Sequence, residues 1–132
     1  MPNLNAALGC AQLEQLPTLV ECQRELYAWY ADAFASLTGA RIVKEPEGCH
    51  SNYWLQTLLL DESLVGLRDQ VLAATNAAGI LTRPAWTLVH QLLPYASCPR
   101  MPLPQAESLA RRIINLPSSA SLLPGLPALA RA

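Results

Sequence analysis

Two side chains with catalytic potential, Cys49 and His50, are neighbours in the sequence. A cysteine activated by a histidine is a common nucleophile and base in enzymes. On an extended chain, however, adjacent side chains point to opposite sides, so these two cannot serve each other in that way. Cys49 paired with the distant His90 stays an open alternative. The chain contains no G-x-S-x-G, H-E-x-x-H, P-loop or G-x-G-x-x-G sequence, so the signatures of the best-known hydrolases, metalloproteases and nucleotide-binding loops are missing.

Lys44 is the only lysine of the chain, beside eight arginines. A lysine that forms a Schiff base needs a pocket that lowers the pKa of its amine and holds the carbonyl partner. Lys44 stands between Val43 and Glu45, with no glycine-rich or aromatic sequence around it. We therefore predict a solvated surface residue and no Schiff-base role.

The other candidate groups have structural explanations. Zinc sites and thiol exchange need closely spaced cysteines, and this chain has no C-x-x-C pair, so we predict reduced thiols and no metal site. The neighbouring carboxylates Asp61 and Glu62 are explained as a helix N-cap and a favourable charge in its first turn. The cysteines are Cys10, Cys22, Cys49 and Cys98.

Composition predicts one globular domain with a surface for a partner. The chain has 132 residues, of which 52% are hydrophobic and only 14% charged. This is slightly apolar for a domain that faces water on all sides. A net charge of −1 with no basic stripe excludes nucleic acid and anionic membranes as expected partners. No apolar run is long enough to span a bilayer and no signal peptide is apparent, which predicts a cytoplasmic protein.

The first third of the chain is predicted to be helical. Apolar residues recur at helical spacing from Leu4 to Leu16, which indicates a first helix. Pro17 interrupts this pattern and suits the first turn of a second helix that runs to Leu37 and is stopped by Gly39.

Strands and shorter helices are predicted to follow. We expect strands at 41–45 and 53–60, the second apolar on both faces and therefore central. A helix capped by Asp61 should run to Ala78, followed by a short strand at 79–83. Five prolines make 84–104 irregular, and a last helix should carry Ile113 and Leu116. We divide the chain into a domain at 1–120 and a C-terminal tail at 121–132.

The sequence resembles a known enzyme family over most of this domain. The residues that carry the resemblance are the opening MPNLNAALGCAQLEQL and the stretch from His50 to Ser119, which contains HSNYWLQTLLL and TRPAWTLVH. They are similar to the C-terminal small domain of the DegT/DnrJ/EryC1/StrS aminotransferases, most of all to the subgroup that works on legionaminic-type sugars. The resemblance implies an α+β fold, a two-layer sandwich with a small antiparallel or mixed sheet covered by helices.

The family's enzymes use pyridoxal phosphate (PLP) to aminate nucleotide-linked keto-sugars, and the resemblance places their catalytic machinery in a large domain that this sequence lacks. The family's N-x-R signature, which touches the phosphate of the neighbouring subunit's cofactor, would end just before Met1. We therefore expect no catalytic residues and no cofactor in this chain on its own.

The resemblance also implies a substrate-side cluster. In the parent fold, the segments that contain these residues face the sugar nucleotide. Arg83 would meet a diphosphate, and Trp86 or Tyr53 would stack on a sugar or base. The structural alternative is that Trp86 and Tyr53 fill the core, Arg83 pairs with an acidic neighbour and His90 caps a turn. The predicted substrate-binding residues are His50, Asn52, Tyr53, Arg83, Trp86 and His90.

Two functions from different classes are compatible with these expectations. The first is a stand-alone, catalytically incomplete remnant or module that forms homo-oligomers or pairs with an intact aminotransferase subunit. The second is a binding protein or enzyme for a small molecule, a sugar nucleotide, that reuses the residual substrate surface. A concave, polar-lined pocket at that surface would favour the second function, and a flat apolar face would favour the first.

Overall fold

The computed structural model describes residues 2–123, so the predicted tail lies outside the described residues beyond Leu123. Its helices are α1 (Asn3–Ala33), α2 (Arg68–Ala77) and α3 (Pro104–Ala110), and its strands are β1 (Ala40–Ile42), β2 (Gln56–Leu60), β3 (Arg83–Pro84) and β4 (Ile113–Leu116). Short 3₁₀ turns occur at Glu62–Leu67, Val89–Gln91, Leu93–Tyr95 and Ala120–Leu122. Within this part of the chain, no helix is both long and apolar enough to cross a membrane.

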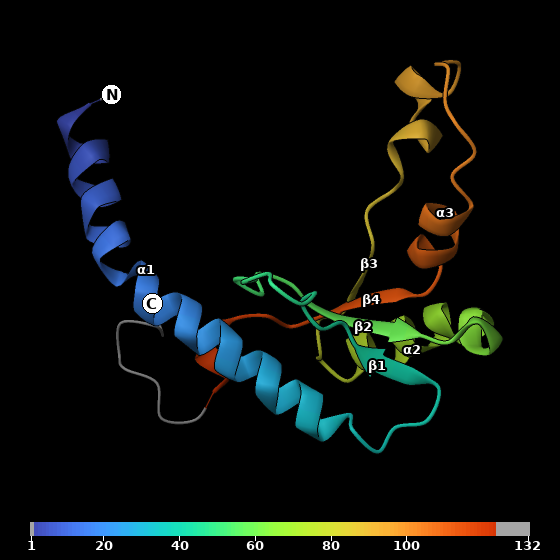
Figure 1. Cartoon of the computed structure of the whole chain (residues 1–132), viewed down its shortest axis with the longest axis horizontal. Coiled ribbons are helices and arrows are strands. Elements are labelled where there is room, and N and C mark those ends of the chain that lie inside the picture. Colours follow the sequence, from blue (N-terminus) through green and yellow to red (C-terminus); the bar gives the residue numbers. More distant parts are fainter. Residues whose placement is uncertain (1, 124–132) are drawn as a thin grey trace.

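The four strands form one antiparallel sheet in the order β1-β2-β4-β3 (Figure 1). The α+β class and the small sheet are as predicted, and the antiparallel alternative is the one found. β2 lies between β1 and β4, so the predicted central position of this strand is confirmed.

The core lies on one face of this sheet. Leu58 and Leu60 project from β2 beside Ile114 of β4, and all three are buried. Phe34, just after α1, and Val71 of α2 pack against them. Both helices therefore cover the same face, and the opposite face of the sheet is free to carry other side chains.

The prediction of two helices broken at Pro17 is wrong, because α1 continues through this proline. Proline removes one backbone donor and pushes the preceding turn aside, which usually bends a helix without ending it when both flanks favour helix. Figure 1 shows α1 bending between an N-terminal arm and the part that packs on the sheet. The helix ends at Ala33, earlier than predicted, and turns lead to Gly39, whose positive φ of 87° suits glycine.

Ile113 and Leu116 do not continue the last helix. α3 ends at Ala110, and Ile113–Leu116 form β4 in the interior of the sheet. Helical spacing over so few residues is ambiguous, and the β-branched pair at 113–114 gains more from pairing with β2. Arg112 secures the change of direction by donating to Leu60 O at 2.9 Å and to Ser108 Oγ at 3.1 Å.

The remaining differences concern the ends of elements. The strands are shorter than predicted, and the third consists of Arg83 and Pro84 only. The helix expected from Asp61 begins as a 3₁₀ turn, and Asp61 makes no side-chain capping bond. The segment at 84–104 is irregular as predicted, apart from its first residue in β3, two single 3₁₀ turns and the first residue of α3.

Removing the buried side chain at the centre of the sheet should destabilise the fold. Ile114 has 0% exposure, so Ile114→Ala leaves a cavity and should lower the free energy of unfolding by about 2–5 kcal/mol. Val89→Ala is the control. Because Val89 is 64% exposed, this substitution should lower the free energy of unfolding by no more than about 0.5 kcal/mol. Urea unfolding followed by circular dichroism measures both, and equal losses would contradict this account of the core.

Candidate functional site

A row of polar side chains crosses the sheet on the face opposite the core. Thr57 of β2 lies opposite Asn115 of β4, which in turn lies opposite Arg83 of β3. Thr57 Oγ1 donates to Asn115 Oδ1 at 3.2 Å, and Asn115 Nδ2 donates to Pro84 O at 3.3 Å. Alternation along the strands puts these three side chains on one face. We call Thr57, Asn115 and Arg83 the outer row.

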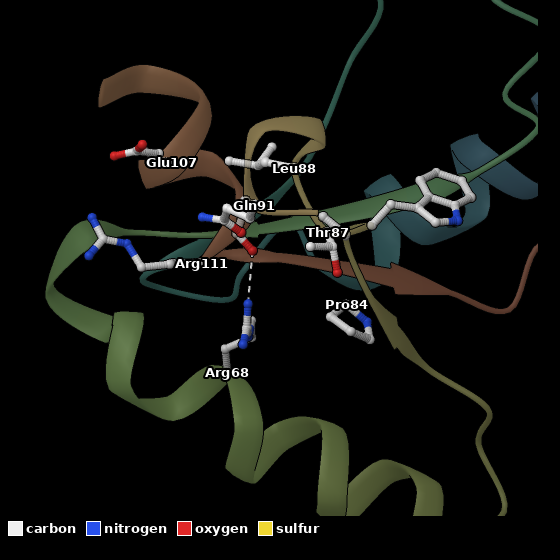
Figure 2. A pocket seen from close by; sticks show the side chains of 10 residues that line it. Arg68, Pro84, Thr87, Leu88, Gln91, Glu107 and Arg111 are labelled. Carbon is white, nitrogen blue, oxygen red and sulfur yellow. Dashed lines mark hydrogen bonds between the residues drawn. The ribbon is translucent and has the colours of Figure 1, made fainter. Parts of the chain in front are cut away.

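A first cavity of about 440 Å³ opens beside β3. Figure 2 shows Glu107, from the middle of α3, and Arg111, which directly follows this helix, on one side of it, and Pro84 and Thr87 on the other. Arg68 forms part of its wall, with Nη1 donating to Ala110 O at 2.8 Å. Guanidinium, carboxamide and hydroxyl groups thus meet in one concave surface. The complete lining is Arg68, Pro84, Ala85, Trp86, Thr87, Leu88, Gln91, Glu107, Ala110 and Arg111.

A second cavity of about 310 Å³ lies at the other end of the outer row, where Thr57 forms part of the wall. His50 and Lys44 line it together with Cys49. The outer row therefore runs from β2, which borders the second cavity, to β3, which borders the first cavity.

An ion pair with α1 holds the loop that carries His50. Arg24 Nη2 lies 2.7 Å from Glu45 Oε1, and its Nη1 lies 3.0 Å from Oε2. Arg24 also donates to Ser51 O at 2.6 Å, and the Ser51 N–H donates to Glu45 Oε2 at 2.6 Å. Hydrogen bonds from Arg24 and then from the Ser51 N–H lower the pKa of Glu45 from 4.5 to about 2.

The structure distributes the six predicted substrate residues over several places. His50 lines the second cavity, Arg83 stands in the outer row and Trp86 lines the first cavity with 69% exposure. His90 lines another cavity, of about 300 Å³, and its Nε2 lies 3.1 Å from Glu107 Oε1. His90 and Cys49 therefore line different cavities, and the open alternative of a Cys49–His90 pair finds no support in their placement.

Two of the six have local structural tasks. Tyr53 is only 6% exposed, stacks on Tyr27 with ring centres 4.0 Å apart, and accepts a hydrogen bond from the Glu45 N–H. Asn52 Oδ1 accepts from the Trp54 N–H at 3.1 Å, which forms a tight turn before β2. The structural alternative thus holds for Tyr53 as a core residue, whereas Trp86 is exposed and does not fill the core.

Sequence reasoning missed Trp54. Its side chain is 66% exposed and its ring centre lies 6.3 Å from that of Trp86. It was assigned to the central strand, but the positive φ of 45° at Tyr53 turns the chain there and exposes the indole. Tyr53 borders the second cavity beside His50, whereas Trp54 is the exposed ring that pairs with Trp86 and joins the 50–55 loop to the segment after β3.

Between residues 2 and 123, no three histidine, cysteine or carboxylate side chains lie close enough together to hold a metal ion. The groups assembled here are hydrogen-bond donors, a few charges and aromatic faces. Groups of this kind are the ones that orient polar ligands in binding sites.

Comparison with known proteins connects these features to one family. Residues 1–125 match the model of the DegT/DnrJ/EryC1/StrS aminotransferase family. The chain is 35% identical over 125 residues to the GDP-perosamine synthase of Caulobacter vibrioides, covering 92% of this chain and 33% of that protein.

Solved structures agree with this match. The aminotransferase TlmJ from Streptoalloteichus hindustanus is 27% identical with a TM-score of 0.79, and the match covers 90% of this chain and 31% of that one. DesI, solved in the presence of its TDP-sugar product, is 32% identical with a TM-score of 0.76, with 85% and 29% covered. The chain thus spans about a third of the length of the proteins it resembles.

The Arg24–Glu45 pair should make stability depend on pH in the acid range. Because the pKa of Glu45 is about 2 in the folded protein and 4.5 ordinarily, the unfolded chain binds more protons between these values. The stabilisation is therefore complete above about pH 4.5 and is lost as the pH falls towards 2. Glu45→Gln should lower the unfolding temperature at pH 6, and its difference from the parent should narrow between pH 4.5 and 2.

The matched control is Glu62→Gln. Glu62 lies 3.7 Å from Arg112 but is 82% exposed, so Glu62→Gln should change the unfolding temperature little at any pH. A constant difference between Glu45→Gln and the parent from pH 6 to pH 2 would contradict the assigned pKa of Glu45.

Proposed function

The chain belongs to the DegT/DnrJ/EryC1/StrS aminotransferase family, and we propose that it is a catalytically incomplete module of a nucleotide-sugar aminotransferase. In this proposal the module does not transaminate by itself. It associates with further copies of itself, or with an intact aminotransferase subunit whose small domain it resembles.

The residues present do not fit the PLP of the family. PLP chemistry needs a lysine in a pocket and a carboxylate free to hold the pyridinium nitrogen. Lys44, the only lysine, borders the second cavity, but its own side chain is exposed to solvent on the chain after β1. The neighbouring Glu45 has both carboxylate oxygens bound by Arg24 and Ser51. No step through the cofactor is therefore assigned to this chain.

The observation that carries the proposal is the N-terminal arm of α1, which we define as Asn3–Leu16. Leu4, Leu8 and Leu13 are 81%, 61% and 66% exposed, and Figure 1 shows the arm leading away from the sheet. A helix that exposes this many leucines offers an apolar face on which another protein segment can pack. The function of the module would thus depend on a second protein chain.

Two finer identities belong to the same proposal. We infer that the matched segment is the C-terminal small domain of the family, as the resemblance implies. The legionaminic-type subgroup stays a prediction, since the relatives include GDP-perosamine synthases from three bacteria.

The protein should be a homodimer or larger in solution. The mass of one chain is 14.3 kDa, so light scattering after size exclusion at micromolar concentration should give at least twice this value. Burying the arm's leucines supplies the driving force. A concentration-independent mass of one chain would contradict self-association and leave only pairing with an intact subunit.

A second function, binding of a sugar nucleotide, is favoured by a separate observation. The outer row, the Trp54–Trp86 pair and the first cavity together offer a guanidinium, hydrogen-bond donors and flat faces. Arg83 is exposed, and no carboxylate of residues 2–123 lies within ion-pair distance of it. A diphosphate is the partner that a guanidinium fork matches best. The first cavity is concave and polar, and Trp86 is the one predicted substrate residue that lines it.

Titration with a nucleotide-diphosphate sugar tests this second function. The dissociation constant should be on the order of millimolar, because the site is open to water. Arg83→Ala should weaken binding by roughly 10- to 100-fold, the value of a charge-assisted hydrogen bond. Arg100→Ala is the control, since Arg100 lines the separate cavity around His90. Binding that survives Arg83→Ala unchanged, or NMR shifts far from the outer row, would reject the site.

A further inference from the structure

The segment after β3 forms one wall of the first cavity. Residues 85–91 supply half of the cavity's lining, with Trp86, Thr87 and Leu88 among them (Figure 2). We call residues 85–91 the loop wall. From the other side, α3 contributes Glu107 and Ala110 to the same lining. The shape of the first cavity therefore depends on how the loop wall is held against α3.

One ion pair connects the loop wall to α3. His90 Nε2 lies 3.1 Å from Glu107 Oε1, and the His90 side chain is only 11% exposed. Within residues 2–123, the segment 85–103 makes no other side-chain hydrogen bond or ion pair. Trp86 contacts Trp54, but this contact leads to the 50–55 loop and not to α3. The pair of His90 with Glu107 is therefore the polar side-chain contact that fixes the loop wall to α3.

The charge of His90 decides how strong this contact is. Histidine side chains change charge between about pH 5 and pH 8, and a hydrogen bond between two charged groups is roughly twice as strong as a neutral one. Tyr95, Cys98 and Arg100 line the cavity of about 300 Å³ around His90. Of these, Arg100 carries a permanent charge and opposes a charge on His90, whereas the carboxylate of Glu107 favours it. Because Glu107 is the charged group in direct contact, the ion pair is stronger in acid.

His90 itself does not line the first cavity. Leu88 borders both the first cavity and the cavity around His90, so the loop wall lies between the two. Glu107 borders the first cavity, and one of its oxygens faces His90. A ligand in the first cavity therefore contacts the loop wall and α3, and His90 can affect this ligand through Glu107.

We propose that His90 is a positioning residue for the first cavity. Protonated His90 holds the loop wall on α3 through Glu107, and loss of this proton to water loosens the wall. A wall that is already in place needs less ordering when a ligand binds, so the first cavity binds its ligand more tightly in acid. The inference rests on the sugar-nucleotide site proposed above and adds its regulation by pH.

The experiment measures the binding of GDP-glucose, a nucleotide-diphosphate sugar, at about pH 5.5 and about pH 7.5, on either side of the usual histidine transition. The diphosphate of GDP-glucose has the same charge at both pH values, so the protein supplies any difference. The dissociation constant should be about 2- to 5-fold smaller at the lower pH, the value of a partly exposed ion pair. His90→Gln can still donate to Glu107 but does not titrate, and it should bind equally at both pH values. Glu107→Gln should also lose the difference.

Each variant has a matched control. His50→Gln removes the only other histidine of the chain, and it should keep the parent's ratio between the two dissociation constants. Glu62→Gln removes an 82% exposed carboxylate outside the first cavity and should keep the same ratio. Circular dichroism at both pH values checks that every variant is folded.

Trp86 provides a second measurement that needs no ligand. With Trp29 and Trp54 replaced by phenylalanine it is the only tryptophan, and it lies in the loop wall. Its emission should change between the two pH values, and either His90→Gln or Glu107→Gln should abolish this change.

Three results would overturn the positioning role. If GDP-glucose binds equally at both pH values, sugar-nucleotide binding stands and the role of His90 falls. If the difference survives Glu107→Gln but not His90→Gln, the charge of His90 acts on the ligand directly. If His50→Gln removes the difference and His90→Gln keeps it, the response belongs to the second cavity. Trp86 emission that depends on His90 and Glu107 without any GDP-glucose binding would instead support the positioning role and reject the sugar-nucleotide site.

Discussion

The antiparallel pairing of β2 with β4 joins residues that are 58 positions apart in the chain, with Thr57 bonded to Asn115 at 3.2 Å. On one face this pairing brings Leu58 beside Ile114, and α1 and α2 can cover the sheet only because that apolar surface exists. On the other face it lines up Thr57, Asn115 and Arg83. The register between β2 and β4 therefore determines both the core and the candidate site. A shift of this register by one residue would move the side chains of each face to the opposite face of the sheet.

The long helix α1 connects three regions that would otherwise be independent. Its last turns reach the core through Phe34, which follows it directly. In its middle, Arg24 clamps the loop carrying His50 through Glu45 and Ser51. Its beginning is the exposed arm. One continuous helix therefore carries all three regions, with the bend at Pro17 between the arm and the part that packs on the sheet.

The two proposed functions use different sides of the molecule. The outer row and the Trp54–Trp86 pair present polar and aromatic groups that suit a small anionic ligand. The arm presents apolar side chains that suit another protein segment. Neither surface contains Lys44.

The sequence alone determined the class of the fold, the family and the helical or extended character of most segments, because periodicity and turn residues act over short distances. It could not determine where Ile113–Leu116 belong, since their preference is settled by β2, a strand far away in the chain. It also could not show that α1 passes through Pro17, because a proline bends a helix without ending it when both flanks remain helical. Tertiary structure decided which aromatic residue is exposed: the left-handed turn at Tyr53 buries that ring against Tyr27 and turns Trp54 towards Trp86. The direction of a side chain after such a turn depends on contacts with residues that are far away in the sequence. The neighbouring residues alone therefore do not predict it.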